Sequence, residues 1–407
     1  SVITNPVFRG TGSFFAVQIF AGGLTVVGSA TGNTGLVAAA TALGTDPVLL
    51  FVAAAVMIFV GFIFSYLSVK WLGWFTIILG LINIIALLVA DLVMLSTPIT
   101  QTVWEHAGLD WSGVAAFDNS AFVDFDWGAV GPALILTVGG MWPYLIMPVA
   151  GEVAQPSRNI PLSNVGGWAG IAFFFLLSAF AVETCMGPDL YGINLAGGVF
   201  PGFGNYAAVI LADNPLAWFV ILCPIYASVL DSPSNALWVT RPMHSMAMDR
   251  FCPEAFASVH PKYHVPHITL YFWLILSLGT VAFSTFLVVT TGTALDALIG
   301  VAFTYVFIRW QMALAAVSLP YYRPTLWERS GAWKFIGIPL ISIGGLIAGA
   351  AFFYSMIAFV PTAGVPYEVW FTVIVYVIGQ IAYMYYGSKN KAKGIEMSAI
   401  FGQLPPE

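Results

Sequence analysis

Ten apolar runs, each long enough to cross a lipid bilayer, dominate this sequence and constrain its fold more than any other feature. A helix rises about 1.5 Å per residue, so about 20 apolar residues cross the roughly 30 Å of hydrocarbon in a membrane. The expected spans are residues 11–32, 47–67, 71–95, 131–151, 164–187, 215–239, 268–290, 294–319, 336–360 and 367–387. The sequence therefore predicts an all-α, polytopic membrane protein.

The composition agrees with this fold class and excludes several functions. Only 8% of the 407 residues are charged and 59% are hydrophobic, whereas soluble domains carry about 25% charged residues. The net charge is −6 and no basic patch exists outside short loops, so no nucleic acid is expected as a partner. The sequence contains no phosphate loop, nucleophile elbow, zinc motif or dinucleotide-binding turn. We therefore expect neither an enzyme nor a metal site.

The basic residues predict the orientation of the spans. If the first span runs outward, twelve of the thirteen fall on one side, and Arg309 lies within a span. By the positive-inside rule that side is cytoplasmic. The chain is then expected in the cell membrane, with a cytoplasmic C-terminus. The twelve are Arg9, Lys70, Arg158, Arg241, Arg250, Lys262, Arg323, Arg329, Lys334, Lys389, Lys391 and Lys393.

One outer loop, residues 96–130, combines acidic and aromatic side chains. Two interpretations of it stay open. The carboxylates could attract cations to an entrance. Alternatively the loop is an ordinary solvated segment whose aromatic rings lie at the level of the lipid headgroups, and we favour this second interpretation.

The span from Gly131 to Gly151 carries helix breakers near its middle. Gly139 and Gly140 weaken the helix there, and Pro143 lacks the N–H that a continuous helix needs. Opened backbone at that depth is tolerated only where it is buried in protein or lines a cavity. A broken helix near the midplane is therefore a candidate binding site. A kink that serves packing alone is the alternative, because transmembrane helices are rich in glycine and proline.

Ionisable residues inside spans are scarce, so each is a functional candidate. Asp231 lies in the span 215–239 beside Ser228 and Ser232. A carboxylate with hydroxyls suits a hard cation, or the carboxyl itself could carry a proton. The alternative is an ordinary, hydrated residue near the cytoplasmic end. Arg309 lies about ten residues from the inner end of its span, so its charge should face the protein interior.

Three segments resemble the amino acid/polyamine/organocation permeases. Glu152 to Pro161, EVAQPSRNIP, is similar to the E-x-x-x-P-x-R-x-I-P signature that follows the sixth helix of that family. Asn235 to Pro266 resembles the loop after its eighth helix, with R-x-x-x-x-M-A-x-D at 241–249 and K-x-x-x-P at 262–266. The tail from Gly394 to Glu407 resembles the C-terminal end of the family.

This resemblance implies a twelve-helix fold whose first ten helices form two inverted repeats of five. Only three spans precede the broken one here, so the first two helices of the family are missing from this sequence. We expect a longer protein, because a lone half-site would expose unsatisfied backbone to lipid; a natively short chain is the alternative. The implied division is residues 1–95 (end of the first repeat), 96–130 (extracellular loop), 131–319 (second repeat), 320–387 (two C-terminal spans) and 388–407 (cytoplasmic tail).

The resemblance also suggests where a substrate would bind. The opened backbone around Gly139, Gly140, Trp142, Pro143 and Tyr144 would present amide and carbonyl groups to a zwitterion. Gly22 and Gly23 lie where the third helix of the family approaches the substrate; close helix packing is the favoured alternative for them. In sodium-coupled relatives the eighth helix, here the span with Ser228, Asp231 and Ser232, supplies cation ligands.

Two functions are compatible with these features. The first is a secondary active transporter of amino acids or related amines, which works by alternating access around a midplane site. It needs no cofactor other than a coupling ion, Na⁺ or H⁺, and its partners are the substrate and the lipid bilayer. The second is a non-transporting receptor or structural subunit on a degenerate transporter scaffold. The sequence does not predict the oligomeric state.

Overall fold

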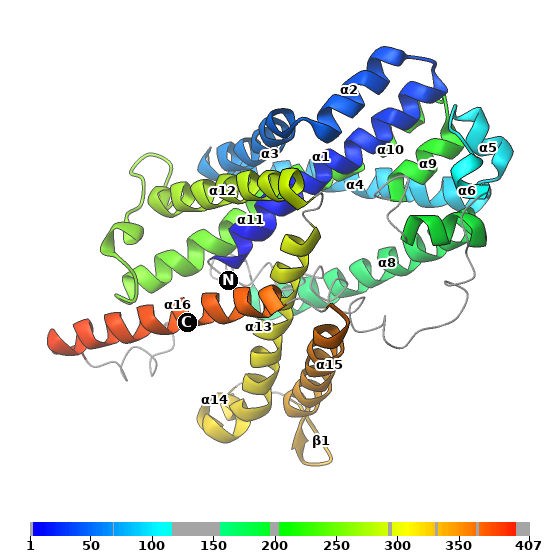
Figure 1. The fold of residues 1–407 in the computed structure, drawn as a ribbon. Coiled ribbons are helices and arrows are strands. Elements are labelled where there is room, and N and C mark those ends of the chain that lie inside the picture. The colour runs from blue at the N-terminus through cyan, green and yellow to red at the C-terminus, as the bar shows by residue number, and fades with distance from the viewer. Residues whose placement is uncertain are drawn as a thin grey trace. The chain divides into compact units, whose positions relative to one another are not determined.

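The structure, a computed structural model, describes residues 3–67, 69–115, 155–195, 203–291, 295–329, 333–363 and 366–395, and these are mostly helical (Figure 1). A short hairpin pairs β1 (Lys334–Phe335) with β2 (Ile338–Pro339). The helices are α1 (Thr4–Ala30), α2 (Thr34–Thr45), α3 (Pro47–Leu67), α4 (Val69–Ser96), α5 (Gln101–His106), α6 (Ser112–Ala115), α8 (Pro156–Leu195), α9 (Phe203–Leu211), α10 (Leu216–Ile221), α11 (Cys223–Met248), the 3₁₀ turn η3 (Glu254–Ala257), α12 (His267–Thr291), α13 (Leu295–Tyr322), α14 (Pro324–Arg329), α15 (Leu340–Ala363) and α16 (Pro366–Ala392).

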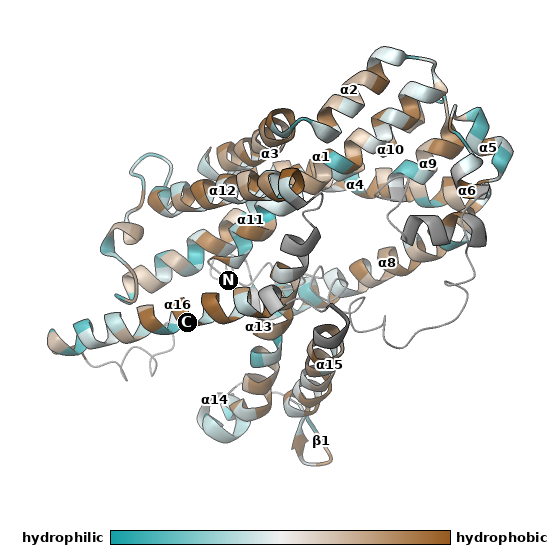
Figure 2. Cartoon of the chain, in the orientation of Figure 1, coloured by the Kyte–Doolittle hydropathy of each residue, from teal (hydrophilic) through white to brown (hydrophobic). Residues whose placement is uncertain are grey.

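Nine stretches of helix in the described part of the chain are long and apolar enough to cross a membrane. Each coincides with one of the expected spans, and Figure 2 shows the apolar residues running along them. The tenth expected span, residues 131–151, lies outside the described residues. The prediction of an all-α polytopic membrane protein is confirmed.

The segment between the first two expected spans, residues 33–46, is mostly helical. Residues Thr34–Thr45 form α2, which packs along α1. Asn33 is the N-cap residue, and its side-chain oxygen accepts a hydrogen bond from the Leu36 backbone N–H at 3.2 Å. The hydrophobic criterion for a span does not identify this helix, because its twelve residues are too few to cross a bilayer.

Two other helix boundaries differ from the expected spans. The span 215–239 is divided at Leu222 into α10 and α11, and Pro224 stands in the first turn of α11. Proline is favoured there because its missing N–H would be unpaired in any case. Helix α8 continues to Leu195, beyond the end of its expected span at residue 187. The short helix α9 follows it at Phe203–Leu211.

The aromatic rings of the 96–130 loop do not all lie where headgroups would contact them. Trp104 of α5 is fully buried, and its indole N–H donates to the Asp110 carbonyl oxygen at 3.1 Å. Its ring packs edge-on against Trp111 at 5.9 Å between centroids. For Trp104 the favoured interpretation, a ring at the headgroup level, is therefore corrected.

The chain forms two compact units. Among the described elements, one unit contains α13, α14, the β-hairpin, α15 and α16 as far as Tyr385. The other contains α1 to α12 and the end of α16. These two units are defined by contacts within the structure. They do not test the division into two inverted repeats that the family resemblance implies, and that division stays a prediction.

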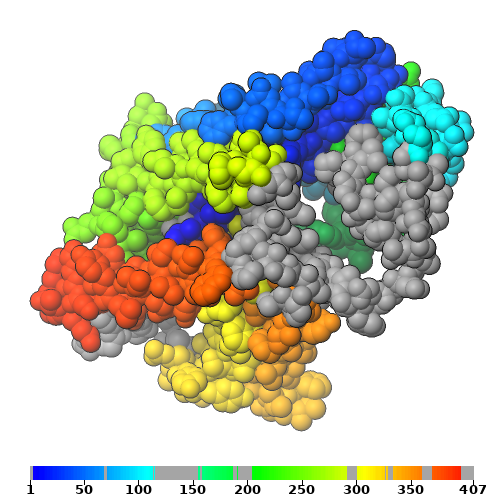
Figure 3. All heavy atoms as spheres, viewed as in Figure 1, coloured from blue at the N-terminus to red at the C-terminus, as the bar shows by residue number. Residues whose placement is uncertain are grey.

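The larger unit is built around four helices, α1, α3, α11 and α12, which we call the four-helix core. Every pair among the four is in contact, and α3 and α12 lie side by side on the face seen in Figure 3. Gly61 of α3 faces Ser232 of α11 so closely that an added Cβ would overlap the serine side chain. Small residues at such contacts let helix backbones approach each other within a membrane. The helices of the four-helix core are therefore tightly packed around the polar side chains between them.

Candidate functional site

A buried ion pair joins α1 to α11 within the four-helix core. Arg9 is 2% exposed, and its Nη1 donates to Asp231 Oδ2 at 3.1 Å. Its Nη2 donates to Ser13 Oγ at 2.6 Å and also to Ser228 Oγ. The guanidinium thus has one carboxylate and two hydroxyl oxygens as acceptors, which compensates for its removal from water.

Helical spacing explains how these side chains meet. Arg9 and Ser13 are four residues apart on α1 and so lie on one face. Ser228 and Asp231 are three residues apart on α11 and also share a face. Ser13 Oγ donates to the Arg9 carbonyl oxygen at 3.0 Å. Because the hydroxyl proton is used in that bond, its lone pairs remain available to the guanidinium.

The structure corrects the place of Arg9. It was counted among the residues of the cytoplasmic loops, but α1 begins at Thr4 and encloses it. The expected span began at residue 11 because the apolar run begins there. The spacing of Arg9 and Ser13 on one extended helix was the signal that could have identified it.

The pair also changes the interpretation of the predicted ion site. Asp231 and Ser228 were expected to bind a coupling ion, and in the structure they contact the Arg9 guanidinium. Ser232, the third predicted ligand, packs against Gly61, and its buried hydroxyl has no hydrogen-bond partner in the described part of the chain. Arginine does not deprotonate in proteins. The site therefore carries a permanent, covalently attached positive charge.

A second polar contact crosses the four-helix core next to this pair. The fully buried Trp273 of α12 donates its indole N–H to Asn235 Oδ1 of α11 at 2.9 Å. Asn235 lies one turn beyond Asp231 on α11. Two polar links in succession therefore fix α11 against α1 and α12.

The glycines predicted on the first span lie in a close helix contact. Gly23 is buried, and an added Cβ would lie 2.6 Å from Ile221 Cβ of α10 and 2.9 Å from Asn205 Oδ1 of α9. The Asn205 amide donates to the Ile19 carbonyl oxygen at 3.0 Å. Gly22, its neighbour, is partly buried. Close packing accounts for Gly23, and a contact between either glycine and substrate stays a prediction.

The remaining predicted site residues lie elsewhere. Arg309 is within α13 and is 7% exposed. It belongs to the smaller unit, and Asp231 belongs to the larger one. The predicted substrate contacts Gly139, Gly140, Trp142, Pro143 and Tyr144 lie outside the described residues, so their geometry stays a prediction.

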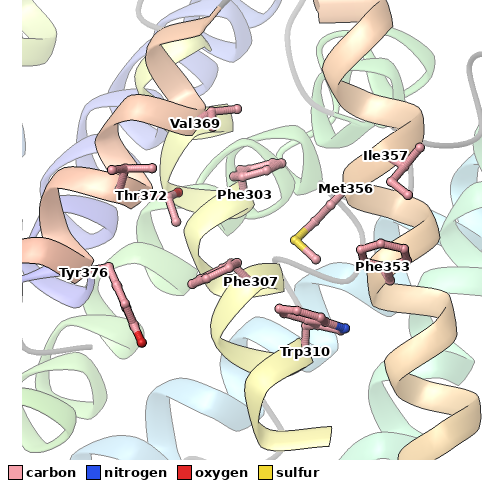
Figure 4. A pocket seen from close by; sticks show the side chains of 10 residues that line it. Phe303, Phe307, Trp310, Phe353, Met356, Ile357, Val369, Thr372 and Tyr376 are labelled. Carbon is pink, nitrogen blue, oxygen red and sulfur yellow. The ribbon is translucent and has the colours of Figure 1, made fainter. Parts of the chain in front are cut away.

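The smaller unit contains an apolar cavity of about 540 Å³ between α13, α15 and α16 (Figure 4). A zwitterion needs polar groups that replace its water shell. The side chains here are almost entirely aromatic or aliphatic, so the cavity does not suit an amino acid. The lining residues are Phe303, Phe307, Trp310, Phe353, Met356, Ile357, Val369, Thr372, Val373 and Tyr376.

Comparison with known proteins extends the resemblance over almost the whole chain. The amino acid permease family matches residues 9–396. The vacuolar cationic amino acid transporter 8 of Arabidopsis thaliana is 25% identical over 222 residues, which cover 53% of this chain and 34% of that protein. The glutamate/serine transporter AimA of Bacillus subtilis is 28% identical over 136 residues, which cover 32% of this chain and 24% of that protein.

An uncharacterized transporter of Rhizobium meliloti is 25% identical over 273 residues, which cover 64% of this chain and 56% of that protein. The matched stretches thus span less than two thirds of each relative's own length. The family match, in contrast, includes eight of the nine described spans in full, the first span from residue 9 onward, and both of the permease-like loops. The chain therefore belongs to the amino acid permease family, within the amino acid/polyamine/organocation superfamily.

Proposed function

We propose that the protein is a secondary active transporter of amino acids or related amines. The family match over residues 9–396 carries this proposal. Two of the relatives are transporters of cationic amino acids and of glutamate and serine by name, so they support the amino acid class and no narrower substrate. In this proposal the substrate binds near the midplane, against the opened backbone of residues 139–144, and one helical bundle rocks against the other.

The Arg9 guanidinium supports a specific form of coupling within this proposal. It holds the carboxylate oxygen and the hydroxyl that a bound Na⁺ would require from Asp231 and Ser228. A second cation at the same oxygens would be repelled by the fixed positive charge. Arg9 therefore takes the place of a coupling cation here, and transport requires no Na⁺ at this site.

A thermal-stability screen of the full-length protein in detergent tests substrate binding. A ligand that binds only the folded state stabilises it by about 2.7 kcal/mol at a hundredfold excess over Kd. We expect at least one amino acid or polyamine to raise the melting temperature, equally in sodium and in choline buffers. A panel of sugars and nucleosides is the control. If no amino acid or amine shifts the transition, the proposed function is wrong.

The proposed orientation, with the loop after α11 in the cytoplasm, can be tested at Cys252. This thiol is half-buried between α11 and η3, and burial raises its pKa, so little thiolate is present at neutral pH. A membrane-impermeant maleimide should leave Cys252 unlabelled in intact cells and label it in inside-out vesicles. The rate should rise between about pH 7 and 9 as the thiolate forms. Cys252→Ser identifies the labelled site, and labelling of Cys252 in intact cells would contradict the orientation.

A further inference from the structure

Asp91, on α4, is a buried carboxyl that the Arg9 site does not use. Its side chain is 0% exposed. Its Oδ2 accepts a hydrogen bond from Ser178 Oγ of α8 at 3.2 Å. Its Oδ1 is also buried and has no hydrogen-bond partner in the ranges that the structure describes. Among the described residues, the neutral hydroxyl of Ser178 is therefore the hydrogen-bond donor to this carboxyl.

The described surroundings of Asp91 are apolar, and no counter-ion lies among the described residues. It is flanked on its own helix by buried Ala90 and faces α8, whose Ala181 and Cys185 are buried in the same cluster. Neither an ion pair nor a basic hydrogen-bond donor reaches Asp91 from the described part of the chain. A charged carboxylate there would be costly, because no cationic side chain among the described residues compensates for its charge.

Several titratable groups lie near the Ser96 end of α4, on the helices that pack against it. Among the described side chains these are thiols, phenols and a carboxyl. The Sγ of Cys223, on α11, donates to Asn83 Oδ1 of α4 at 3.2 Å. Asp91 is the one buried acidic residue among those whose side chains the structure describes. Asp231 is partly exposed and forms an ion pair with Arg9, and Glu183 is exposed. Among the side chains that the structure describes, the other buried or partly buried titratable groups near this end of α4 are Tyr226 of α11, Cys185 of α8 and Tyr206 of α9.

We propose that Asp91 is a proton-binding site of the transport cycle. When the site opens, an O–H bond of a hydronium ion breaks and an O–H bond forms at a carboxylate oxygen, which leaves a water molecule. When the proton leaves on the other side, the carboxyl O–H bond breaks and the proton passes to water. No electron transfer and no third reactant are involved. Asp91 is five residues from the end of α4 at Ser96, about 7.5 Å along the helix axis. It thus lies within reach of the aqueous boundary, which a proton site requires.

This inference rests on the proposed transport function and adds the ion that drives it. Arg9 forms an ion pair with Asp231, so that carboxylate has a fixed counter-charge within the protein. Asp91 has no such partner among the described residues, so a proton is the ligand that would neutralise it. The two carboxyls thus have different roles, one fixed and one exchanging.

Infrared difference spectroscopy of the full-length protein reads this site without any substrate. Spectra of wild type and Asp91→Asn, recorded between roughly pH 5 and 9, isolate the C=O stretch of a protonated carboxyl. We expect a band that titrates in the wild type and is absent from Asp91→Asn. Glu183→Gln, which removes an exposed carboxyl of α8, should leave the band unchanged. A spectrum that is identical in wild type and Asp91→Asn, or a band that never titrates, would overturn the proposal.

Transport in liposomes supplies the second readout. We expect an inward proton gradient to drive accumulation by the wild type, and Asp91→Asn to exchange substrate without accumulating it. If Asp91→Asn fails to fold, Asp91→Glu keeps a carboxyl and should accumulate substrate with a displaced pH profile. Full accumulation by Asp91→Asn would overturn the proton site. If the wild type exchanges no amino acid but the infrared band titrates, the proposed function fails and the proton site stands.

Discussion

Replacing Asp231 with alanine is expected to lower the free energy of unfolding by about 3 kcal/mol, because it leaves the Arg9 guanidinium buried without its counter-ion. This is the lower end of the range for a buried pair, since the Asp231 side chain is 38% exposed and partly screened. Among the residues that the structure describes, the hydroxyls of Ser13 and Ser228 would remain as its side-chain acceptors. Unfolding by denaturing detergent in mixed micelles measures the change.

Two variants separate the charge from the packing at this position. Asp249→Ala removes an exposed carboxylate at the end of the same helix and should change stability by less than about 0.5 kcal/mol. Arg9→Met with Asp231→Leu replaces the pair by apolar groups of similar size, so it should recover most of the loss. That double variant should still fail to transport if the guanidinium replaces a coupling cation. A single Asp231→Ala as stable as wild type would show that the pair is not structural.

The second large effect is expected at Trp273. Trp273→Ala removes a fully buried indole from the four-helix core, and such truncations lower stability by about 3 to 5 kcal/mol. The variant also leaves Asn235 Oδ1 without its donor. Trp273→Phe keeps most of the ring and loses the hydrogen bond, so its loss should be smaller. The same unfolding measurement in mixed micelles applies.

Trp74→Ala is the matched control for this prediction. Trp74 of α4 is 56% exposed, so its removal creates no cavity and should have little effect on the free energy of unfolding. Equal losses in Trp273→Ala and Trp74→Ala would contradict the assignment of Trp273 to the core. A loss in Trp273→Phe as large as in Trp273→Ala would assign the stability to the hydrogen bond instead of the ring.

The number and placement of the described spans could be predicted because bilayer thickness sets their length. Residues 47–67, for example, were expected as a span and form α3 with the same bounds. Short helices such as α2 could not be found in this way, since they need not cross the membrane. Their helical structure depends on caps such as Asn33 and on packing against a neighbour such as α1.

The site was predictable in part. The rarity of charge within spans singled out Asp231 and Arg309. The partner of Asp231 is Arg9, 222 residues away in sequence, and no local pattern predicts a contact over that distance. Asp91 stands close to the end of an apolar run, so the sequence alone does not predict that it is buried. Its burial depends on α8, which packs over that end of α4.

Uptake of radiolabelled amino acids by the full-length protein in liposomes tests the central proposal most directly. The proposed roles of Arg9 and Asp91 predict accumulation under an inward proton gradient, with the same rate when choline replaces sodium. The double variant of Arg9 and Asp231 should be inactive under both conditions. Neither accumulation nor exchange of any amino acid, under sodium or proton gradients, would contradict the assignment of this permease as a transporter.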